Sequence, residues 1–418
     1  MKTGSVFGYV VYVVVLMAIH CNVLSTAILH PMDFLALQSI RKSLDDFKGS
    51  TFFSTWDFTS DPCNFTGVFC LQDRVVSLYL GDPRAGSPGL IGRLDPAIGK
   101  LSALAEFTLV PGRVIGTLPS SFSQCTNLRF LALARNFISG GIPASLGDLR
   151  ALQTLDLSYN LLTGEIPHSV GNLPALRNVI LCHNKLSGSL PHFVSQSLTK
   201  FDLKHNDLSG SLSSTSLPTS LQYLSLSSNR LAGPVHTLLE RLARLNYLDL
   251  SLNNFNGPIP SNLFTFPITT LQLQRNAFSG RILPPSQVTI PTVDLSFNRL
   301  YGDISPMFST VQNLYLNNNR FSGEVPPSLV DRLLSADIQV LYLQHNFLTG
   351  IPMNSKAEIP VSSSLCLQYN CMVPPVQTPC PLRSGKQITR PATQCGYWKK
   401  LSSLFGVAAD HQYEDDNP

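Results

Sequence analysis

Leu155-Asp-Leu-Ser-Tyr-Asn160 is followed directly by Leu161-Leu-Thr-Gly-Glu-Ile-Pro167, and both segments recur along the chain. In the first segment two apolar residues stand two positions apart, so their side chains lie on one face of a short strand. The residue between them points to the opposite face. One such unit cannot bury its apolar face alone, whereas stacked units bury their faces against each other. The segment therefore predicts one coil of a stacked repeat.

An asparagine ends the strand segment in coil after coil. The steps between these asparagines run from 21 to 27 residues, which fits the period of about 20–29 residues of leucine-rich repeats. The chain turns there, and an asparagine amide both donates and accepts hydrogen bonds, so a stacked column satisfies the buried backbone groups. We expect a structural role for Asn136, Asn160, Asn184, Asn206, Asn229, Asn253, Asn276, Asn298, Asn319, Asn346 and Asn370.

The segment after each asparagine reads L-x-G-x-I-P or a close variant at residues 162–167, 186–191, 255–260 and 321–326. This motif resembles the plant-specific class of extracellular leucine-rich repeats. The resemblance implies an α/β solenoid, a right-handed superhelix with a parallel β-sheet on its concave face. It also implies a second short strand in each coil, short helical or 3-10 segments on the convex face, and disulfide-stapled caps. We expect about 12–13 coils over residues 74–370.

The N-terminus has the pattern of a secretory signal peptide. Lys2 precedes an almost wholly apolar run over residues 6–19, and small residues follow at 25–27. The run is shorter than the roughly 20 residues of a membrane-spanning helix, so we expect residues 1–27 to be cleaved. The tail, residues 396–418, ends in acidic residues and does not resemble a lipid-anchor signal. We expect a mature chain without a membrane span, secreted to the extracellular space or cell wall.

Both ends of a solenoid need caps. In the N-terminal cap, residues 28–73, the pattern predicts a helix that Asp33 caps and Gly49 ends. Trp56 and a pair formed by Cys63 and Cys70 follow. This arrangement resembles the N-terminal cap of plant receptor-like proteins and polygalacturonase-inhibiting proteins, with Phe65 where those proteins usually carry tryptophan. Asn64 begins an N-x-T sequon, so we expect a glycan on it if it is exposed.

The C-terminal cap, residues 366–395, is rich in cysteine. Disulfides are expected in a secreted chain, and four cysteines allow three pairings among which the sequence does not choose. These are Cys366, Cys371, Cys380 and Cys395. Cys125 and Cys182 lie in different coils, too far apart for a bridge, so we expect both to be free thiols.

The sequence lacks the motifs of the main enzyme classes. It has no HExxH, no GxSxG, no phosphate-binding loop and no dinucleotide-binding glycine turn. We therefore expect no catalysis, no cofactor and no metal site. The net charge of +4 over 418 residues is too weak to indicate nucleic-acid binding.

The outward positions of the strands form the candidate binding face. Tyrosine and arginine are enriched at binding hot spots, and exposed aromatic residues mark interaction surfaces. We expect Tyr223, Tyr247, Phe297, Tyr315 and Tyr342 to form one band, with Arg275 as the anchor for an acidic group. The full set of candidate partner-binding residues is Phe130, Arg135, Tyr159, His205, Tyr223, Tyr247, Arg275, Phe297, Tyr315 and Tyr342.

Three functions fit this surface to different degrees. The first is non-catalytic recognition of a protein, peptide or cell-wall glycan in cell-surface signalling or defence, with a receptor kinase among the candidate partners. The second is inhibition of a cell-wall-degrading enzyme, as in polygalacturonase-inhibiting proteins, for which clustered acids are expected. Instead, acids such as Asp156 and Asp249 alternate with bases such as Arg135 and Lys204. A structural wall protein is the third and weakest, because the proline-rich extension of leucine-rich-repeat extensins is missing.

Overall fold

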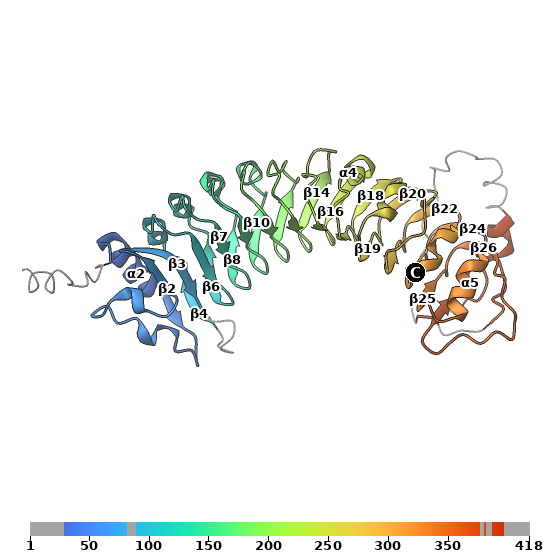
Figure 1. Ribbon diagram of the computed structural model, residues 1–418, viewed down its shortest axis with the longest axis horizontal. Coiled ribbons are helices and arrows are strands. Elements are labelled where there is room, and N and C mark those ends of the chain that lie inside the picture. Colours follow the sequence, from blue (N-terminus) through green and yellow to red (C-terminus); the bar gives the residue numbers. More distant parts are fainter. Residues whose placement is uncertain (1–28, 82–88, 377–379, 382–386, 397–418) are drawn as a thin grey trace, which may run out of the picture.

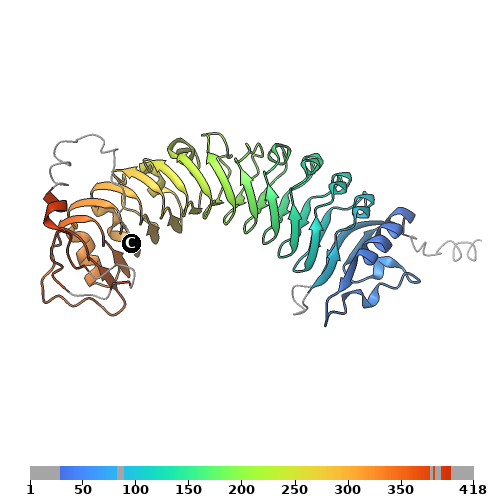
Figure 2. The ribbon, with the colours of Figure 1, turned by 180° about the vertical axis from the view of Figure 1, so that it is seen from behind.

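The computed structural model describes residues 29–81, 89–376, 380–381 and 387–396, and these form one long arch (Figure 1). The expected signal peptide lies outside the described residues, as does the expected tail apart from its first residue. The arch is the predicted stack of coils, in which each coil contributes one strand to each of two sheets. The same coils, seen from behind, follow one another without a break in the stacking (Figure 2).

The first sheet lines the concave side of the arch and has fourteen strands among the described residues. Its strands are parallel from β3 onward, while β2 pairs antiparallel with β3 at the N-terminal end. In order they are β2 (Val68–Leu71), β3 (Arg74–Leu80), β5 (Glu106–Leu109), β7 (Phe130–Ala132), β9 (Thr154–Asp156), β11 (Asn178–Ile180), β13 (Lys200–Asp202), β15 (Tyr223–Ser225), β17 (Tyr247–Asp249), β19 (Thr270–Gln272), β21 (Thr292–Asp294), β23 (Asn313–Tyr315), β25 (Val340–Tyr342) and β27 (Ser364–Cys366).

The second sheet has thirteen strands among the described residues, which confirms the second strand implied by the L-x-G-x-I-P motif. The motif glycine takes a positive φ in most coils, for example 76° at Gly164, a conformation that glycine adopts without strain. The strands are β1 (Leu44–Asp46), β4 (Leu90–Arg93), β6 (Arg113–Thr117), β8 (Phe137–Gly140), β10 (Leu161–Gly164), β12 (Lys185–Gly188), β14 (Asp207–Ser211), β16 (Arg230–Pro234), β18 (Asn254–Gly257), β20 (Ala277–Gly280), β22 (Arg299–Asp303), β24 (Arg320–Glu324) and β26 (Phe347–Gly350).

Short helical segments complete the coils, and α4 is visible on the outer side of the arch (Figure 1). The helical turn in the longest coil is α5, which is amphipathic and buries Leu329, Val330 and Leu333. The α-helices are α2 (Pro31–Ser43), α3 (His168–Gly171), α4 (His236–Arg241) and α5 (Pro327–Leu334); the 3-10 segments are η1 (Phe52–Thr55), η2 (Pro62–Asn64), η3 (Pro96–Lys100), η4 (Ser120–Gln124), η5 (Ala144–Asp148), η6 (Ser261–Thr265) and η7 (Pro306–Thr310).

The asparagine column holds the coils together as predicted. Asn229 shows the arrangement: its Nδ2 donates to the carbonyl oxygens of Leu203 and Leu226, both at 3.0 Å, and of Ser227 at 3.3 Å. Its Oδ1 accepts from the Leu208 N–H at 3.0 Å. One side chain thus satisfies backbone groups of its own coil and of the preceding coil.

The predicted boundaries of the first helix were wrong. Helix α2 begins at Pro31, where the His30 side chain accepts a hydrogen bond from the Met32 N–H, and it ends at Ser43. Asp33 is not the cap: it is fully buried, and Arg74 donates to both of its carboxylate oxygens. The chain leaves the helix at Leu44 because β1 pairs with β4, so tertiary pairing overrides the helical spacing.

Disulfides staple both caps. Cys63 pairs with Cys70, and at the C-terminal end Cys366 pairs with Cys380 and Cys371 with Cys395. This selects one of the three pairings that the sequence left open. Cys125 and Cys182 are buried free thiols as predicted, and burial raises the pKa of each to about 12. Asn64 is exposed, so its glycosylation stays a prediction.

Candidate ligand-binding face

Three columns of side chains run along the concave face, one residue per coil. The first column holds the first residue of each strand, and the second column holds the third residue, two positions later. Strand pairing aligns both columns, as in Tyr223↔Tyr247 and Ser225↔Asp249. The turn column is the residue before each structural asparagine: Arg135, Tyr159, His183, His205, Ser228, Leu252, Arg275, Phe297, Asn318, His345 and Tyr369.

The backbone of the turn column is left-handed throughout. Each of its residues has φ between 54° and 60°, a region that residues other than glycine seldom occupy. The structural asparagine that follows bonds the carbonyl groups of this turn and stabilises the conformation. The turn brings large side chains to the surface, because Tyr159 is 43% and Phe297 38% exposed.

At the N-terminal half of the turn column, side chains from four successive coils stack on each other. The rings of Tyr159 and His183 are 4.2 Å apart and nearly parallel, and those of His183 and His205 are 4.3 Å apart. The Arg135 guanidinium lies over the Tyr159 ring at 5.2 Å. The structure therefore brings together three predicted residues, Arg135, Tyr159 and His205, and adds His183 between them.

The surroundings of His183 lower the pKa of its ring. Burial lowers the pKa of this imidazole, and the neighbouring His205 and the Lys204 ammonium lower it further. The lowered pKa means that the folded protein favours the neutral ring. The stabilisation is complete above the ordinary histidine pKa near 6.5 and is lost as the pH falls through the lower folded value.

We expect acidification to loosen these coils. In a histidine NMR titration, the His183 ring should titrate below pH 6.5, and the thermal midpoint should fall as the pH is lowered through that value. The variant His183→Phe keeps the stacked ring without the charge, so it should lose this part of the pH dependence. A His183 that titrates at or above the ordinary histidine value would contradict the expectation.

Near the middle of the concave face, two tyrosines of the first column stack. The Tyr223 and Tyr247 rings are 4.4 Å apart with 4° between their planes, and the Lys200 ammonium lies 5.1 Å from the Tyr223 ring. Burial raises the pKa of both phenols. The pair is a neutral aromatic stack that joins β15 and β17.

The acidic residues of the second column are largely buried. Asp202 is 5% and Asp249 7% exposed, and the Asp294 carboxylate accepts from the Ser296 hydroxyl at 2.6 Å. Burial raises the pKa of Asp202 and of Asp294. These carboxylates support the turns and do not form an exposed acidic patch.

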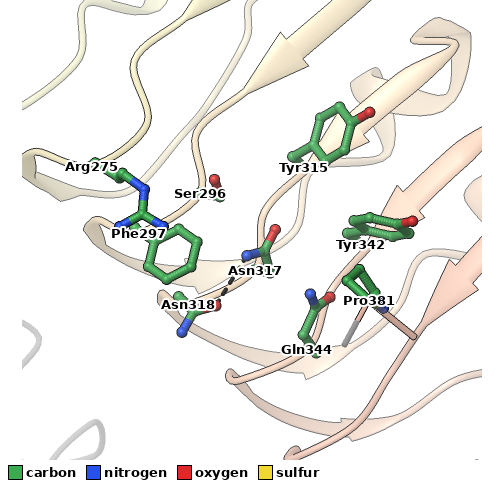
Figure 3. A pocket seen from close by; sticks show the side chains of 9 residues that line it. All are labelled: Arg275, Ser296, Phe297, Tyr315, Asn317, Asn318, Tyr342, Gln344 and Pro381. Carbon is green, nitrogen blue, oxygen red and sulfur yellow. Dashed lines mark hydrogen bonds between the residues drawn. The ribbon is translucent and has the colours of Figure 1, made fainter. Parts of the chain in front are cut away.

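A pocket of about 240 Å³ opens on the C-terminal half of the face (Figure 3). Arg275 lies over the Phe297 ring at 4.3 Å, and the Tyr315 and Tyr342 rings meet edge to face at 5.4 Å. Pro381 of the C-terminal cap lies beside Tyr342. The lining residues are Arg275, Ser296, Phe297, Tyr315, Asn317, Asn318, Tyr342, Gln344 and Pro381.

The predicted aromatic band is divided between two places. Tyr223 and Tyr247 stack in the first column, whereas Tyr315 and Tyr342 lie in the second column and Phe297 in the turn column. The difference arises because the ring stands at the first residue of β15 and β17 but at the third residue of β23 and β25. Phe130, 36% exposed, lies at the start of β7, four strands away from Tyr223 in the sheet.

Sequence reasoning missed three residues of these sites. His183 could have been found, because it occupies the same repeat position as His205. Gln344 stands two residues before its structural asparagine, a position that is buried in most coils. The sequence therefore does not show that Gln344 lines a pocket. Pro381 belongs to the cap, which the repeat pattern does not position.

Two family models match the chain. The model of the leucine-rich repeat N-terminal domain matches residues 30–71. The leucine-rich repeat model matches residues 127–149, 151–173, 220–242, 244–266 and 310–331. The chain therefore has the N-terminal cap and the repeats of the plant class of extracellular leucine-rich-repeat proteins. The matches cover the N-terminal cap and several of the coils that carry the columns described above.

Relatives of this leucine-rich-repeat protein include plant receptors. A probable inactive leucine-rich repeat receptor-like protein kinase of Arabidopsis thaliana is 40% identical over 76 residues, which are 18% of this chain and 10% of the relative. The plant peptide hormone receptor RGFR1 in complex with RGF2 is 29% identical, with a TM-score of 0.55 over 68% of this chain and 54% of that chain.

The Arabidopsis receptor kinase HAESA, solved with the peptide hormone IDA and the co-receptor SERK1, is 26% identical. Its TM-score is 0.55, over 82% of this chain and 66% of that chain. The leucine-rich-repeat protein thus spans about half to two thirds of these solved chains and a small part of the curated relative. No helix in its described part is long and apolar enough to cross a bilayer.

Proposed function

We propose that this leucine-rich-repeat protein is a non-catalytic recognition protein that binds a peptide through its concave face, between β15 and β25, in cell-surface signalling or defence. The observation that carries the proposal is the concave pocket, where Arg275 and three aromatic rings converge from neighbouring coils. The structural relatives solved with peptide hormones support the same use of the fold. A receptor kinase of the cell surface is the partner class that such a complex would engage.

The face suits an extended peptide. The stacked rings of Tyr223 and Tyr247 offer aromatic surface, and Arg275 offers a charged group that pairs with carboxylates in a fixed geometry. Aromatic and arginine side chains supply most of the binding energy in protein interfaces. A peptide that spans β15 to β25 would contact both clusters at once.

Inhibition of a cell-wall-degrading enzyme is less well supported. A protein that blocks a cationic cleft needs exposed acids, and complementary charge is what such interfaces use for steering. Asp202 and Asp249 are buried, and Asp294 is bonded to Ser296. The concave face therefore presents aromatic rings and bases to a partner more than it presents carboxylates.

Capture of the partner tests the proposal. The immobilised protein should retain a peptide or protein from plant extracellular fluid, and the double variant Tyr247→Ala with Arg275→Glu should weaken capture at least about tenfold. The loss of an aromatic hot spot and the reversal of a charge each remove about 1–2 kcal/mol or more of binding energy. The melting temperature of the double variant should stay close to that of the unchanged protein.

A matched control comes from the other side of the coil. Glu165 is exposed beside β10, so Glu165→Lys changes one surface charge outside the concave face and should leave capture unchanged. Capture that survives the double variant but is lost when the C-terminal cap is altered would place the binding site on the cap and refute the concave-face proposal.

A further inference from the structure

The concave pocket contains a buried acceptor that has no donor. Gln344 is 4% exposed, and its Oε1 has no hydrogen-bond partner in the structure. A buried polar atom without a partner costs free energy, and such atoms are rare in folded proteins. Because Gln344 lines the pocket, a ligand placed there lies against this side chain (Figure 3).

The repeat itself does not require this acceptor, although Gln274, at the same position of another coil and outside the pocket lining, also has a buried Oε1 without a partner. At the equivalent position, the hydroxyls of Ser158, Ser251 and Ser296 each donate at 2.6 Å to an aspartate two residues earlier. The residue two positions before Gln344 is Tyr342, which has no carboxylate. In this coil a glutamine stands in place of the hydrogen-bonded serine and aspartate, and its amide oxygen has no donor within the protein.

The neighbouring polar group in the pocket is already engaged. The Asn317 Nδ2 donates to the Asn318 Oδ1 at 3.0 Å, and the Ser296 hydroxyl donates to Asp294. Gln344 Oε1 is thus the lining side-chain atom that the structure leaves buried and without a bond. A ligand that fits has one donor at its inner end.

Shape and charge define the rest of the ligand. Phe297, Tyr315 and Tyr342 form apolar walls, and the volume of about 240 Å³ exceeds the roughly 150 Å³ of an engineered cavity that binds benzene. The pocket accordingly has room for one aromatic ring system. Arg275 at its edge repels a cationic donor, so lysine and arginine side chains do not fit.

A sugar matches this pocket less well. A monosaccharide carries several hydroxyl groups, and each one buried without a partner costs free energy. The edge-to-face geometry of Tyr315 and Tyr342, with 84° between their planes, makes a corner and not a flat stacking platform. A mostly apolar ring with a single neutral donor fits both observations.

We propose that the pocket binds a tyrosine or tryptophan side chain of the peptide partner, whose O–H or N–H donates to Gln344 Oε1. The proposal rests on the proposed function, because it names the group that the concave face recognises. Specificity follows from the orphan acceptor: a phenylalanine fills the same space but leaves Gln344 unsatisfied, and sites of this kind discriminate strongly against an analogue that lacks the donor.

Amino-acid amides test the proposal on the full chain. N-acetyl-tyrosinamide, N-acetyl-tryptophanamide and N-acetyl-phenylalaninamide are titrated and followed by ligand-observed NMR. We expect the tyrosine or tryptophan amide to bind at least about tenfold more tightly than the phenylalanine amide. Binding should broaden the ring signals of the bound amide and be absent in the presence of a captured partner.

The variant Gln344→Met separates recognition from folding. Methionine keeps the length of the side chain and removes the acceptor, so the preference over the phenylalanine amide should disappear. The same change removes a buried unsatisfied group, so the melting temperature should rise. As a matched control, Gln272→Met alters a glutamine of the second column in β19, outside the pocket, and should change neither the preference nor, to the same extent, the melting temperature.

Two outcomes would overturn the inference. Equal binding of all three amides to the unchanged protein is one. The other is binding of glucose or galacturonate that Gln344→Met abolishes, which makes the pocket a sugar site. If the amides fail to discriminate while the Tyr247→Ala and Arg275→Glu changes still reduce partner capture, the side-chain proposal alone is wrong. If the protein prefers the tyrosine or tryptophan amide but those changes leave partner capture unaffected, the proposed function is wrong, while the side-chain specificity of the pocket still holds.

Discussion

Arg74→Met is expected to lower the unfolding free energy of the N-terminal coils by about 3–5 kcal/mol, the cost of leaving one partner of a buried ion pair alone. The Asp33 side chain is fully buried, and the Arg74 Nη2 lies 2.9 Å from its Oδ1. Without the guanidinium, that buried carboxylate keeps the hydrogen bond from the Val75 N–H at 2.9 Å but loses its counter-charge.

The expected loss is large because this pair joins the cap to the repeats. Asp33 lies on α2 and Arg74 begins β3, and Arg74 also donates to Ser102 at 2.7 Å. The hydrogen bonds to Asp33 raise the pKa of the Arg74 guanidinium, so the charge of Arg74 is not lost at any ordinary pH. Breaking the pair therefore exposes an apolar end of the solenoid, which depends on its cap for stability.

Urea denaturation followed by circular dichroism measures the effect. Arg230→Met provides the matched control, because Arg230 and Asp207 form an exposed pair at 2.7 Å, for which about 0–1 kcal/mol is expected. The double variant Asp33→Leu with Arg74→Met removes both charges and should recover much of the loss. Equal midpoints for Arg74→Met and Arg230→Met would show that the buried pair does not hold the cap.

Asn229→Ala is expected to cost about 3 kcal/mol or more, because the change leaves the buried Leu208 N–H without its acceptor and three carbonyl groups without a donor. The loss spans two coils, since Leu203 and Leu208 belong to the coil before Asn229. It should match the cost of Leu226→Ala, a fully buried leucine whose truncation costs about 2–5 kcal/mol.

The control for this prediction is an asparagine outside the column. Asn246 is exposed just before β17, and Asn246→Ala should change the unfolding free energy by no more than about 0.5 kcal/mol. Thermal melts of the three variants test the comparison. If Asn229→Ala proves as mild as Asn246→Ala, the column of asparagines does not stabilise the stack in the way that its hydrogen bonds indicate.

The stack of coils could be predicted from the sequence alone. The spacing of Leu155 and Leu157 defines an inward face, and the recurring asparagine defines the turn, because both depend on contacts that every coil repeats with its neighbour. Local pattern or resemblance also predicted three further features. These are the second strand, the free thiols of Cys125 and Cys182, and the pairing of Cys63 with Cys70. These features need no knowledge of which distant residues meet.

Contacts across coils, and contacts between the repeats and a cap, could not be predicted from the sequence. The end of α2 depends on the pairing of β1 with β4, and the partner of Asp33 lies 41 residues away at Arg74. The cap likewise selected the pairing of Cys366 with Cys380. Helical spacing and cysteine counts carry no information about such contacts.

The binding face divides in the same way. Its outward positions could be predicted, since side chains alternate along a strand. The contacts among these residues could not be predicted, because they depend on the register of neighbouring strands. The register separates Tyr223 from Tyr315 and places His183 between Tyr159 and His205. The orphan oxygen of Gln344 exists only because a fold of several coils encloses it, and a sequence shows the amide but not the missing donor.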